Sequence, residues 1–325
     1  MCSVINPYSE HFNSNYFDGL YKIDLKKVQV FRDGEVALIG SKDFWPIIYI
    51  YEKDIYNKEK HAFVSDERHD DYTCFIQLSN GDYVSGFDND TIIINDALTG
   101  NKKMRILKEY NDDDDFDCYS DEEGVLALIQ LPNGYLVSSY TDNSVVIRDI
   151  SQNEPKLINM FRLKADSFIL LPDSNDLACF SNDSISFISF QNEFGFCFQR
   201  KFFINKTTNL FNIRSPFLLP NNDLVFVHEK DKICTIDINR QRIKSTVSYG
   251  SEIKNAVLLP NGYLAWTSND NTKLMIGSIN EKHIYHEIKP FDHEIKSLTL
   301  LLDGNLITIS ERKHIVLWKI DYTTV

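Results

Sequence analysis

The sequence contains no long hydrophobic run and is poor in positive charge. No uncharged apolar stretch approaches the roughly 20 residues of a membrane-spanning helix, so we expect no association with a membrane. Residues 1–17 are polar and lack the basic start and apolar core of a signal peptide, so we expect a cytoplasmic protein. Lys and Arg number 34 against 47 Asp and Glu, and the net charge of −13 argues against binding to nucleic acid or anionic membranes.

Cysteine pairs and the common catalytic motifs are missing as well. None of the six cysteines forms a C-x-x-C pair, and we expect reduced, buried thiols. The chain has no phosphate-binding glycine loop, no H-E-x-x-H motif and no G-x-S-x-G motif. We therefore predict no catalytic residues, no metal ligands and no cofactor.

The sequence does contain a repeat. Its clearest copy is Leu131-Pro132-Asn133-Gly134, a tight turn that is followed by an apolar run. Asn-Gly and Asp-Gly accept the positive φ that hairpin turns require. Seven copies of the pattern begin at Phe31, Leu78, Leu131, Leu171, Leu219, Leu259 and Leu301.

The spacing of the copies predicts the architecture. Successive copies begin 40 to 53 residues apart, and a propeller repeat of four strands takes about 40–45 residues. We predict an all-β fold, a single seven-bladed β-propeller of four-stranded antiparallel blades. It spans residues 19–325 and follows an arm of residues 1–18. Leu131 and Ile147 are predicted core positions in the third blade.

The copies resemble the repeats of the WD-repeat (Trp-Asp repeat) β-propeller family, and the resemblance covers nearly the whole chain. The positions that match the family pattern are Ser85, Gly86, Thr91, Asp96, Ser138, Asp142, Asp149 and Trp318. No copy has the complete Trp-Asp pair, because Asn95, Arg148 and Lys319 each occupy one of its two positions. The resemblance implies a protein-interaction scaffold. These departures imply that the family's Ser-His-Asp-Trp hydrogen-bond network is incomplete in every blade.

The two ends of the chain are expected to complete one blade. Residues 19–24 are predicted to form a strand before the first full copy, and the last copy, residues 295–321, supplies three strands. A ring that closes in this way has no exposed sheet edge. We therefore predict that the N-terminal strand is the fourth strand of the seventh blade.

An acidic insertion separates the second and third copies. Residues 111–123 contain eight acidic side chains in thirteen positions, a composition that does not fold compactly alone. The candidate partner-binding residues are Asp112, Asp113, Asp114, Asp115, Asp117, Tyr119, Asp121, Glu122 and Glu123. In the family topology this connection lies on one face of the disc, and an acidic face would attract a basic protein or peptide at a salt-dependent rate. The alternative is that the acidic residues only aid solubility.

A second candidate surface is rich in phenylalanine. Phe194, Phe196 and Phe198 alternate, which places them on one face of a strand. They either fill the gap between two neighbouring blades or form an outer edge that docks a partner.

The main alternative function is an enzyme or a small-ligand-binding propeller that uses the mouth of the central channel. Candidates for such a site are Arg68, His69, Asp292 and His293, which form no recognisable constellation.

Metal binding is weighed separately. His283 and His286 are three residues apart and would point to opposite faces of one strand, so scattered surface histidines are the simpler interpretation even with His293 nearby. Asp88, Asp90 and the acidic insertion lack the ligand spacing of a calcium loop.

Two further hypotheses concern the setting in which a scaffold would act. One is an adaptor that presents a target to a ubiquitin ligase, although no additional helical domain is recognisable. The other is a host-directed bacterial protein, since the abundance of Asn, Ile, Lys and Phe is typical of an AT-rich genome. We expect the chain to be a monomer on its own, with one or more proteins as partners.

Overall fold

A computed structural model describes residues 24–31, 33–42, 45–51, 59–64, 71–108, 124–172, 174, 176–191, 195–202, 213–238, 240, 242–288, 293–311, 315–320 and 322. Every regular element within these residues is a strand. No helix among them is long and apolar enough to cross a membrane.

The strands form seven antiparallel sheets, and the fold is the all-β, seven-bladed propeller that the repeat predicts. Six of the sheets have four strands, and the seventh has three within the described residues. The chain divides into two compact units. Unit 1 comprises Met1–Arg68 and Phe211–Val325, and unit 2 comprises His69–Leu210.

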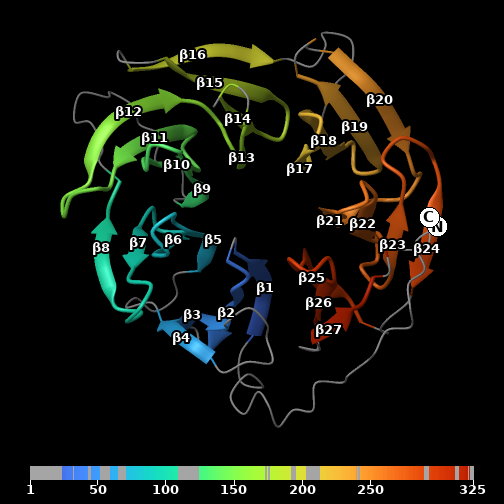
Figure 1. The fold of residues 1–325 in the computed structure, drawn as a ribbon, viewed down its shortest axis with the longest axis horizontal. Coiled ribbons are helices and arrows are strands. Elements are labelled where there is room, and N and C mark those ends of the chain that lie inside the picture. Colours follow the sequence, from blue (N-terminus) through green and yellow to red (C-terminus); the bar gives the residue numbers. More distant parts are fainter. Residues whose placement is uncertain are drawn as a thin grey trace. The chain divides into compact units, whose positions relative to one another are not determined.

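Unit 2 contains the second, third and fourth sheets, counted from the N-terminus. The second sheet consists of β5 (Tyr72–Gln77), β6 (Tyr83–Phe87), β7 (Ile92–Asn95) and β8 (Lys102–Ile106). The third consists of β9 (Val125–Gln130), β10 (Leu136–Tyr140), β11 (Ser144–Asp149) and β12 (Lys156–Arg162). The fourth consists of β13 (Ser167–Leu170), β14 (Leu177–Phe180), β15 (Ile185–Gln191) and β16 (Gly195–Phe202). Their first strands pack side by side, β5 against β9 and β9 against β13 (Figure 1).

Unit 1 contains the first, fifth, sixth and seventh sheets. The first sheet consists of β1 (Asp24–Val30), β2 (Val36–Lys42), β3 (Trp45–Tyr51) and β4 (Glu59–Val64). The fifth consists of β17 (Arg214–Leu218), β18 (Asp223–His228), β19 (Lys232–Asp237) and β20 (Arg242–Ser248). The sixth consists of β21 (Lys254–Leu258), β22 (Leu264–Thr267), β23 (Leu274–Gly277) and β24 (Ile284–Ile288). The seventh consists of β25 (Ile295–Leu300), β26 (Leu306–Ser310) and β27 (Ile315–Trp318).

The repeated turn joins the first and second strands of a sheet. Hydrogen bonds among five consecutive residues stabilise it. In the third sheet, the Leu131 amide donates to the Tyr135 carbonyl and the Gly134 amide donates to the Leu131 carbonyl, both at 2.9 Å. The Asn133 side chain accepts from the Tyr135 amide at 3.1 Å. The fourth turn position has positive φ in Gly34, Gly81, Gly134, Asn222, Gly262 and Gly304. Glycine and asparagine adopt this conformation most readily, which is why the sequence pattern locates these turns.

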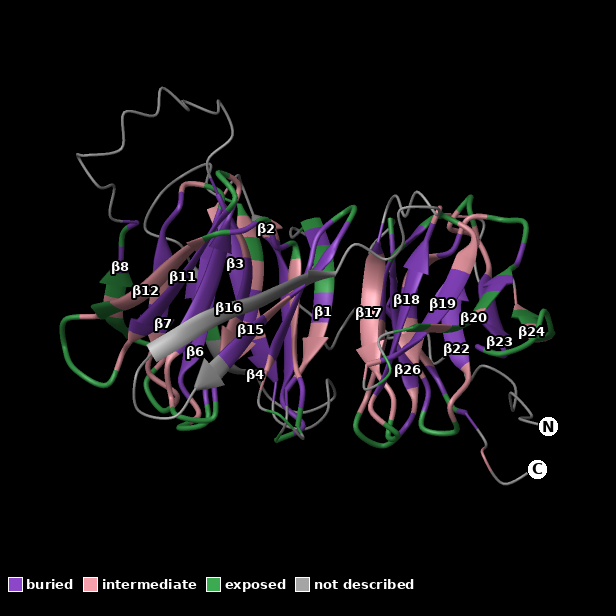
Figure 2. Ribbon diagram, turned by 90° about the horizontal axis from the view of Figure 1, so that it is seen from above, coloured by how far each residue is buried: buried purple, intermediate pink, exposed green. Residues whose placement is uncertain are grey.

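The core lies between neighbouring sheets. Between the third and fourth sheets, Val137, Ile147 and Ile188 are fully buried and pack with Leu131, which is 3% exposed. The predicted core positions Leu131 and Ile147 are therefore confirmed. Outer strands such as β8 and β24 expose several side chains, whereas β6, β18 and β22 are buried along their length (Figure 2).

The first and last sheets pack against each other within unit 1. The Val28 amide in β1 donates to the Ser297 hydroxyl in β25 at 3.3 Å, and the Thr299 hydroxyl donates to the Val28 carbonyl at 2.9 Å. Leu25 and Val28 share a buried cluster with Ile307 and other residues of the seventh sheet. The described ends of the chain are thus joined.

The predicted N-terminal closing strand needs a correction at its end. Asp24 belongs to β1, the first strand of the first sheet, and pairs there with Ser41. Residues 19–23 lie outside the described residues, so the strand that would complete the seventh blade stays a prediction, as does the division into an arm of residues 1–18 and a propeller of residues 19–325.

Candidate functional site

The predicted acidic surface lies outside the described residues, but the residues that flank this segment, Lys108 and Gly124, lie within them. All nine candidates, from Asp112 to Glu123, belong to residues 109–123, for which the structure gives no account. Lys108 follows β8 on one side of this segment, and Gly124 precedes β9 on the other. The site can therefore be examined at its two ends.

One carboxylate contacts both ends. Asp90 lies in the turn between β6 and β7, and its Oδ1 accepts a hydrogen bond from the Gly124 amide at 2.7 Å. Its Oδ2 lies 3.6 Å from Lys108 Nζ, which also bonds Asp142 Oδ2 at 2.5 Å. The Lys108 side chain is only 4% exposed. The buried Lys108 ammonium depends on these carboxylates, because a buried charge without a partner is costly.

The Asp142 carboxyl stays ionised in this arrangement. Burial alone would raise its pKa, but hydrogen bonds from Lys108 and Ser144 favour the charged form and hold the pKa below its ordinary value. The Ser144 amide and hydroxyl both donate to Asp142 Oδ1, at 2.9 and 2.6 Å. The predicted turn aspartate of the third blade thus fixes its own turn and pairs with a lysine.

A second buried cation, Arg148, contacts the same tyrosine as Lys108. Lys108 Nζ lies 4.9 Å from the centre of the Tyr140 ring, and Arg148 Nη1 donates to the Tyr140 hydroxyl at 3.1 Å and approaches Ser138 Oγ at 3.4 Å. Arg148 is 3% exposed. It occupies the place in β11 where the WD-repeat pattern has tryptophan. In the seventh sheet the tryptophan is present, and Trp318 Nε1 donates to the Thr308 hydroxyl at 3.0 Å.

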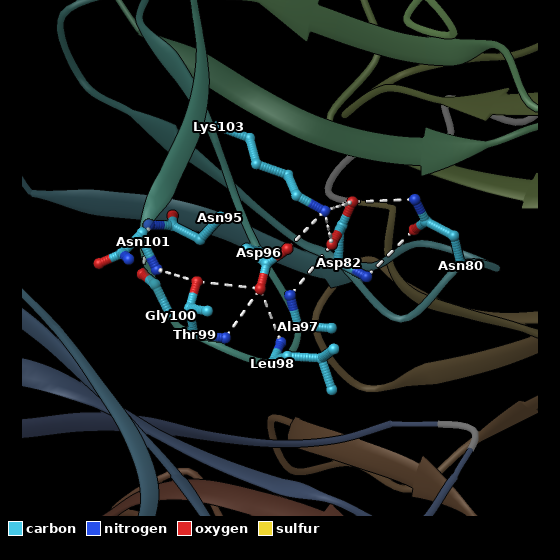
Figure 3. Close-up of polar contacts among 10 residues, drawn as sticks. All are labelled: Asn80, Asp82, Asn95, Asp96, Ala97, Leu98, Thr99, Gly100, Asn101 and Lys103. Carbon is cyan, nitrogen blue, oxygen red and sulfur yellow. Dashed lines mark hydrogen bonds and ion pairs between the residues drawn. The ribbon is translucent and has the colours of Figure 1, made fainter.

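A different polar cluster joins two turns of the second sheet (Figure 3). Lys103 Nζ lies 2.8 Å from Asp82 Oδ1 and 2.7 Å from Asp96 Oδ2. Asp82 also accepts from the Ala97 amide at 3.0 Å, and Asp96 accepts from the Thr99 amide at 2.7 Å. The pKa of Asp96 is far below its ordinary value, chiefly because of the hydrogen bond from Lys103. These carboxylates are fully engaged in holding turns, which suits a structural role better than acid–base chemistry.

The same cluster recurs in the fifth sheet. Lys244 Nζ bonds both oxygens of Asp223, at 2.7 and 2.5 Å, and lies 3.8 Å from Asp237. The acidic residues are 14 positions apart and the lysine follows the first by 21, as in Asp82, Asp96 and Lys103. This spacing of charges is present in the sequence, but turns and apolar runs alone do not reveal it.

The phenylalanine surface is only partly described. Phe194 lies outside the described residues. Phe196 and Phe198 belong to β16, where they pair with Phe190 and Ile188 of β15. The docking role of this strand stays a prediction.

Most of the candidates for a channel-mouth site lie outside the residues that the structure describes. Arg68, His69 and Asp292 lie outside the described residues, and His293 lies within them. His283 lies directly before β24 and His286 lies within it, so the two histidines do not both belong to that strand. The His283 ring packs edge-on against Tyr285, with 4.5 Å between centres.

Asp88 and Asp90, at the β6–β7 turn, both accept hydrogen bonds from main-chain amides. Asp88 Oδ1 accepts from the Asp71 amide at 3.0 Å, and Asp90 is held by Gly124 and Lys108. Within the part of the chain that the structure describes, no group of three or more His, Cys, Asp and Glu side chains is arranged to hold a metal.

Burial changes the chemistry of one histidine and two cysteines, and both cysteines are buried as expected. Burial lowers the pKa of His228, a residue at the end of β18 that is 4% exposed. Burial also raises the pKa of the Cys179 thiol, and raises that of Cys234 to about 11. At neutral pH the imidazole is therefore uncharged and both thiols are protonated and unreactive.

Comparisons with known proteins place the fold and nothing finer. No protein-family model matches the sequence, and no curated protein matches it. A chain in the crystal structure of the mitotic checkpoint complex has this fold. The two chains share 14% identity and a TM-score of 0.68, and the match covers 92% of this chain and 87% of that one. At this identity the likeness bears on the fold alone.

Proposed function

We propose that this chain is a non-catalytic scaffold that binds another protein. The observation that carries the proposal is the propeller fold, whose rigid sheets leave the connecting segments free to differ. The solved chain that is similar in fold comes from the mitotic checkpoint complex and is therefore part of an assembly. The buried carboxylates support a scaffold as well, because Asp82, Asp90 and Asp223 each bind a lysine or a main-chain amide.

We also propose that the chain is a divergent WD-repeat protein. The hydrogen bond from Trp318 to Thr308 supports this, because Trp318 occupies the tryptophan position of the family pattern. Thr308 lies seven residues after Leu301, as Ser138 lies seven residues after Leu131. Arg148 makes the equivalent contact to Ser138 in the third sheet. Sequence comparison fails when such substitutions accumulate, while the geometry of the strands persists.

The binding surface in this proposal is the acidic insertion, with Asp112–Asp115 at its centre and a basic protein or peptide as partner. The overall charge of −13 and the density of carboxylates in residues 111–123 support it. Long-range attraction of a basic partner would raise the association rate at low salt and lose strength as salt screens the charges. We place the protein inside the cell, and the unpaired, buried thiols of Cys179 and Cys234 agree with a reducing compartment.

Affinity purification with mass spectrometry tests this function. The intact protein is compared with a variant in which Asp112, Asp113, Asp114 and Asp115 are changed to Asn. A matched control removes four charges elsewhere, at the exposed residues Glu154, Glu281, Glu294 and Glu311, each changed to Gln.

We expect the intact protein and the control to retain a specific partner that the Asn variant loses. A partner kept by all three forms would move the binding surface elsewhere, with Phe196 and Phe198 next to be tested. Recovery of no partner by any form would contradict the scaffold.

A further inference from the structure

We propose that the Asn133-Gly134 pair, in the turn between β9 and β10, is a site of spontaneous deamidation. Asparagine followed by glycine is especially prone to this reaction, because glycine has no side chain that obstructs attack by its own amide nitrogen. The chain contains three such pairs, which begin at Asn80, Asn133 and Asn261. The reaction is independent of the proposed function.

The reaction consumes only water. Solvent hydroxide removes the Gly134 amide proton, and the amide nitrogen then attacks Cγ of Asn133. A bond forms between these two atoms, the bond from Cγ to Nδ2 breaks, and the nitrogen leaves as ammonia after taking a proton from water, which regenerates the hydroxide. Water opens the resulting cyclic imide at either of its carbonyl groups, so the product is aspartate or isoaspartate. Either product adds a negative charge to the turn.

The Asn133 side chain is lightly held. Asn133 is exposed, and within the described residues its side chain has one hydrogen bond, in which Oδ1 accepts from the Tyr135 amide at 3.1 Å. The Gly134 amide donates to the Leu131 carbonyl at 2.9 Å, and the Gly134 carbonyl accepts from Gln130 Nε2 at 3.2 Å. A Cβ atom built on Gly134 would meet no atom of the described residues within 4 Å, so the turn has room to change shape as the imide forms.

The Asn80 side chain is held more firmly at the same turn position of the second sheet (Figure 3). Asn80 is exposed as well, and the Gly81 amide makes the equivalent main-chain bond. However, Asn80 Nδ2 donates to Asp82 Oδ2 at 2.9 Å, and Asn80 Oδ1 accepts from the Asp82 amide at 3.1 Å. Asp82 is itself fixed by Lys103 and by the Ala97 amide. More contacts must therefore break before Cγ of Asn80 can be attacked, so we expect the folded structure to protect this residue.

The turn of the third sheet also accepts the aspartate product. Asp303 occupies the same turn position in the seventh sheet, and its Oδ1 accepts from the Asn305 amide at 2.9 Å. Aspartate at position 133 can keep the corresponding bond from the Tyr135 amide. Aspartate at position 80 would instead place a second carboxylate beside Asp82, where an amide donor now stands.

Peptide mapping by mass spectrometry tests the proposal. The intact protein is incubated at mildly alkaline pH, once folded and once in concentrated urea. In the folded protein we expect Asn133 to deamidate at least about tenfold faster than Asn80, and in urea we expect the two rates to agree within about threefold, because both asparagines precede glycine. Absence of deamidation at Asn133, or equal rates at the two residues in the folded protein, overturns the proposal. A tenfold difference that persists in urea overturns it as well, because the neighbouring sequence would then set the rates.

Two substitutions test the cause of the protection. Asp82→Ala removes the carboxylate that accepts from Asn80 Nδ2, and we expect deamidation of Asn80 to become about fivefold faster or more. The matched control, Asp96→Ala, removes the other carboxylate that pairs with Lys103 and leaves both bonds between Asn80 and Asp82 in place, so we expect an unchanged rate. The same rate in Asp82→Ala as in the control overturns the protective role of Asp82. Should Asp82→Ala fail to fold, the comparison of Asn80 with Asn133 in the intact protein decides.

Discussion

At the scale of single residues, different buried polar side chains make the same kind of hydrogen bond at equivalent positions of two sheets. Arg148 and Trp318 both donate to a hydroxyl on the neighbouring second strand, although one side chain is a cation and the other an indole. The Arg148 guanidinium also donates to the Tyr140 hydroxyl, which gives this buried side chain a second hydrogen bond. Hydrogen bonding at such a site is maintained by geometry, and residue identity is free to change.

Truncation of Ile147 tests the core between the third and fourth sheets. Ile147 is fully buried, and we expect Ile147→Ala to lower the free energy of unfolding by about 2–4 kcal/mol, from lost burial and the cavity left behind. Chemical denaturation measures the change. The control is Leu302→Ala, at a residue 66% exposed, which we expect to change stability by less than about 0.5 kcal/mol. An equal effect of the two substitutions would show that Ile147 contributes no core packing.

Asp270 provides a pH-dependent contribution to stability. Hydrogen bonds from the Ser268 hydroxyl and the Thr272 amide lower its pKa from 3.8 to about 2. Because the folded pKa lies below the unfolded one, the contribution is complete above about pH 4 and is lost as pH falls toward 2. We expect Ser268→Ala to shift the Asp270 carboxyl titration upward in NMR, while Ser251→Ala, an exposed control, leaves it in place. A titration that is identical in both variants would show that the hydroxyl is not the cause.

At the scale of elements, the second sheet and the fifth sheet each contain a lysine and two aspartates that link turns of that same sheet. In both sheets the lysine on the outer strand reaches an aspartate at the start of the second strand. The contact ties the exposed outer strand to the buried part of the sheet (Figure 3). Outer strands have only one neighbour in the sheet, so side-chain links of this kind compensate for their missing partner.

A double-mutant cycle on Asp82 and Lys103 measures this link. The Asp82 side chain is 8% exposed and that of Lys103 is 45% exposed, so solvent weakens the pair to an intermediate strength. We expect a coupling energy of about 1 kcal/mol between Asp82→Ala and Lys103→Met in chemical denaturation. Pairing Asp82→Ala with Lys164→Met, at an exposed lysine, should give no coupling. Coupling of the same size in both cycles would mean that the measured effect is not specific to the pair.

At the scale of the whole molecule, residues from the two ends of the chain share one interface. Val28 exchanges hydrogen bonds with Ser297 and Thr299, although these residues are about 270 positions away in the sequence. The first and seventh sheets therefore depend on each other for burial of their facing side chains. Removing one end should weaken both sheets.

Deletion of residues 1–23 tests the predicted closing strand while leaving β1 intact. If residues 19–23 contribute the fourth strand of the seventh sheet, we expect a lower melting temperature and faster hydrogen exchange in β27. Deletion of residues 1–18 alone is the control, and we expect it to change neither. A melting temperature that stays the same in both deletions would contradict closure by the N-terminal strand.

The sequence by itself determined the sheets of this protein. The Asn-Gly and Asp-Gly turns and the apolar runs predicted seven sheets and the core positions Leu131 and Ile147. Each turn is stabilised by hydrogen bonds within five residues, as those among Leu131, Asn133 and Tyr135 illustrate. The residues that specify a turn are therefore neighbours in the chain, and the sequence alone predicts it.

Only the tertiary structure decided which distant groups meet. Asp90 and Gly124 are 34 residues apart, as are Lys108 and Asp142, and no sequence period links them. Whether Arg148 or His228 is buried depends on the sheet that packs against it, not on neighbours in the chain. Local turns follow from short-range sterics and hydrogen bonding, whereas a site built from separate strands exists only after the sheets have packed and excluded water from their charges.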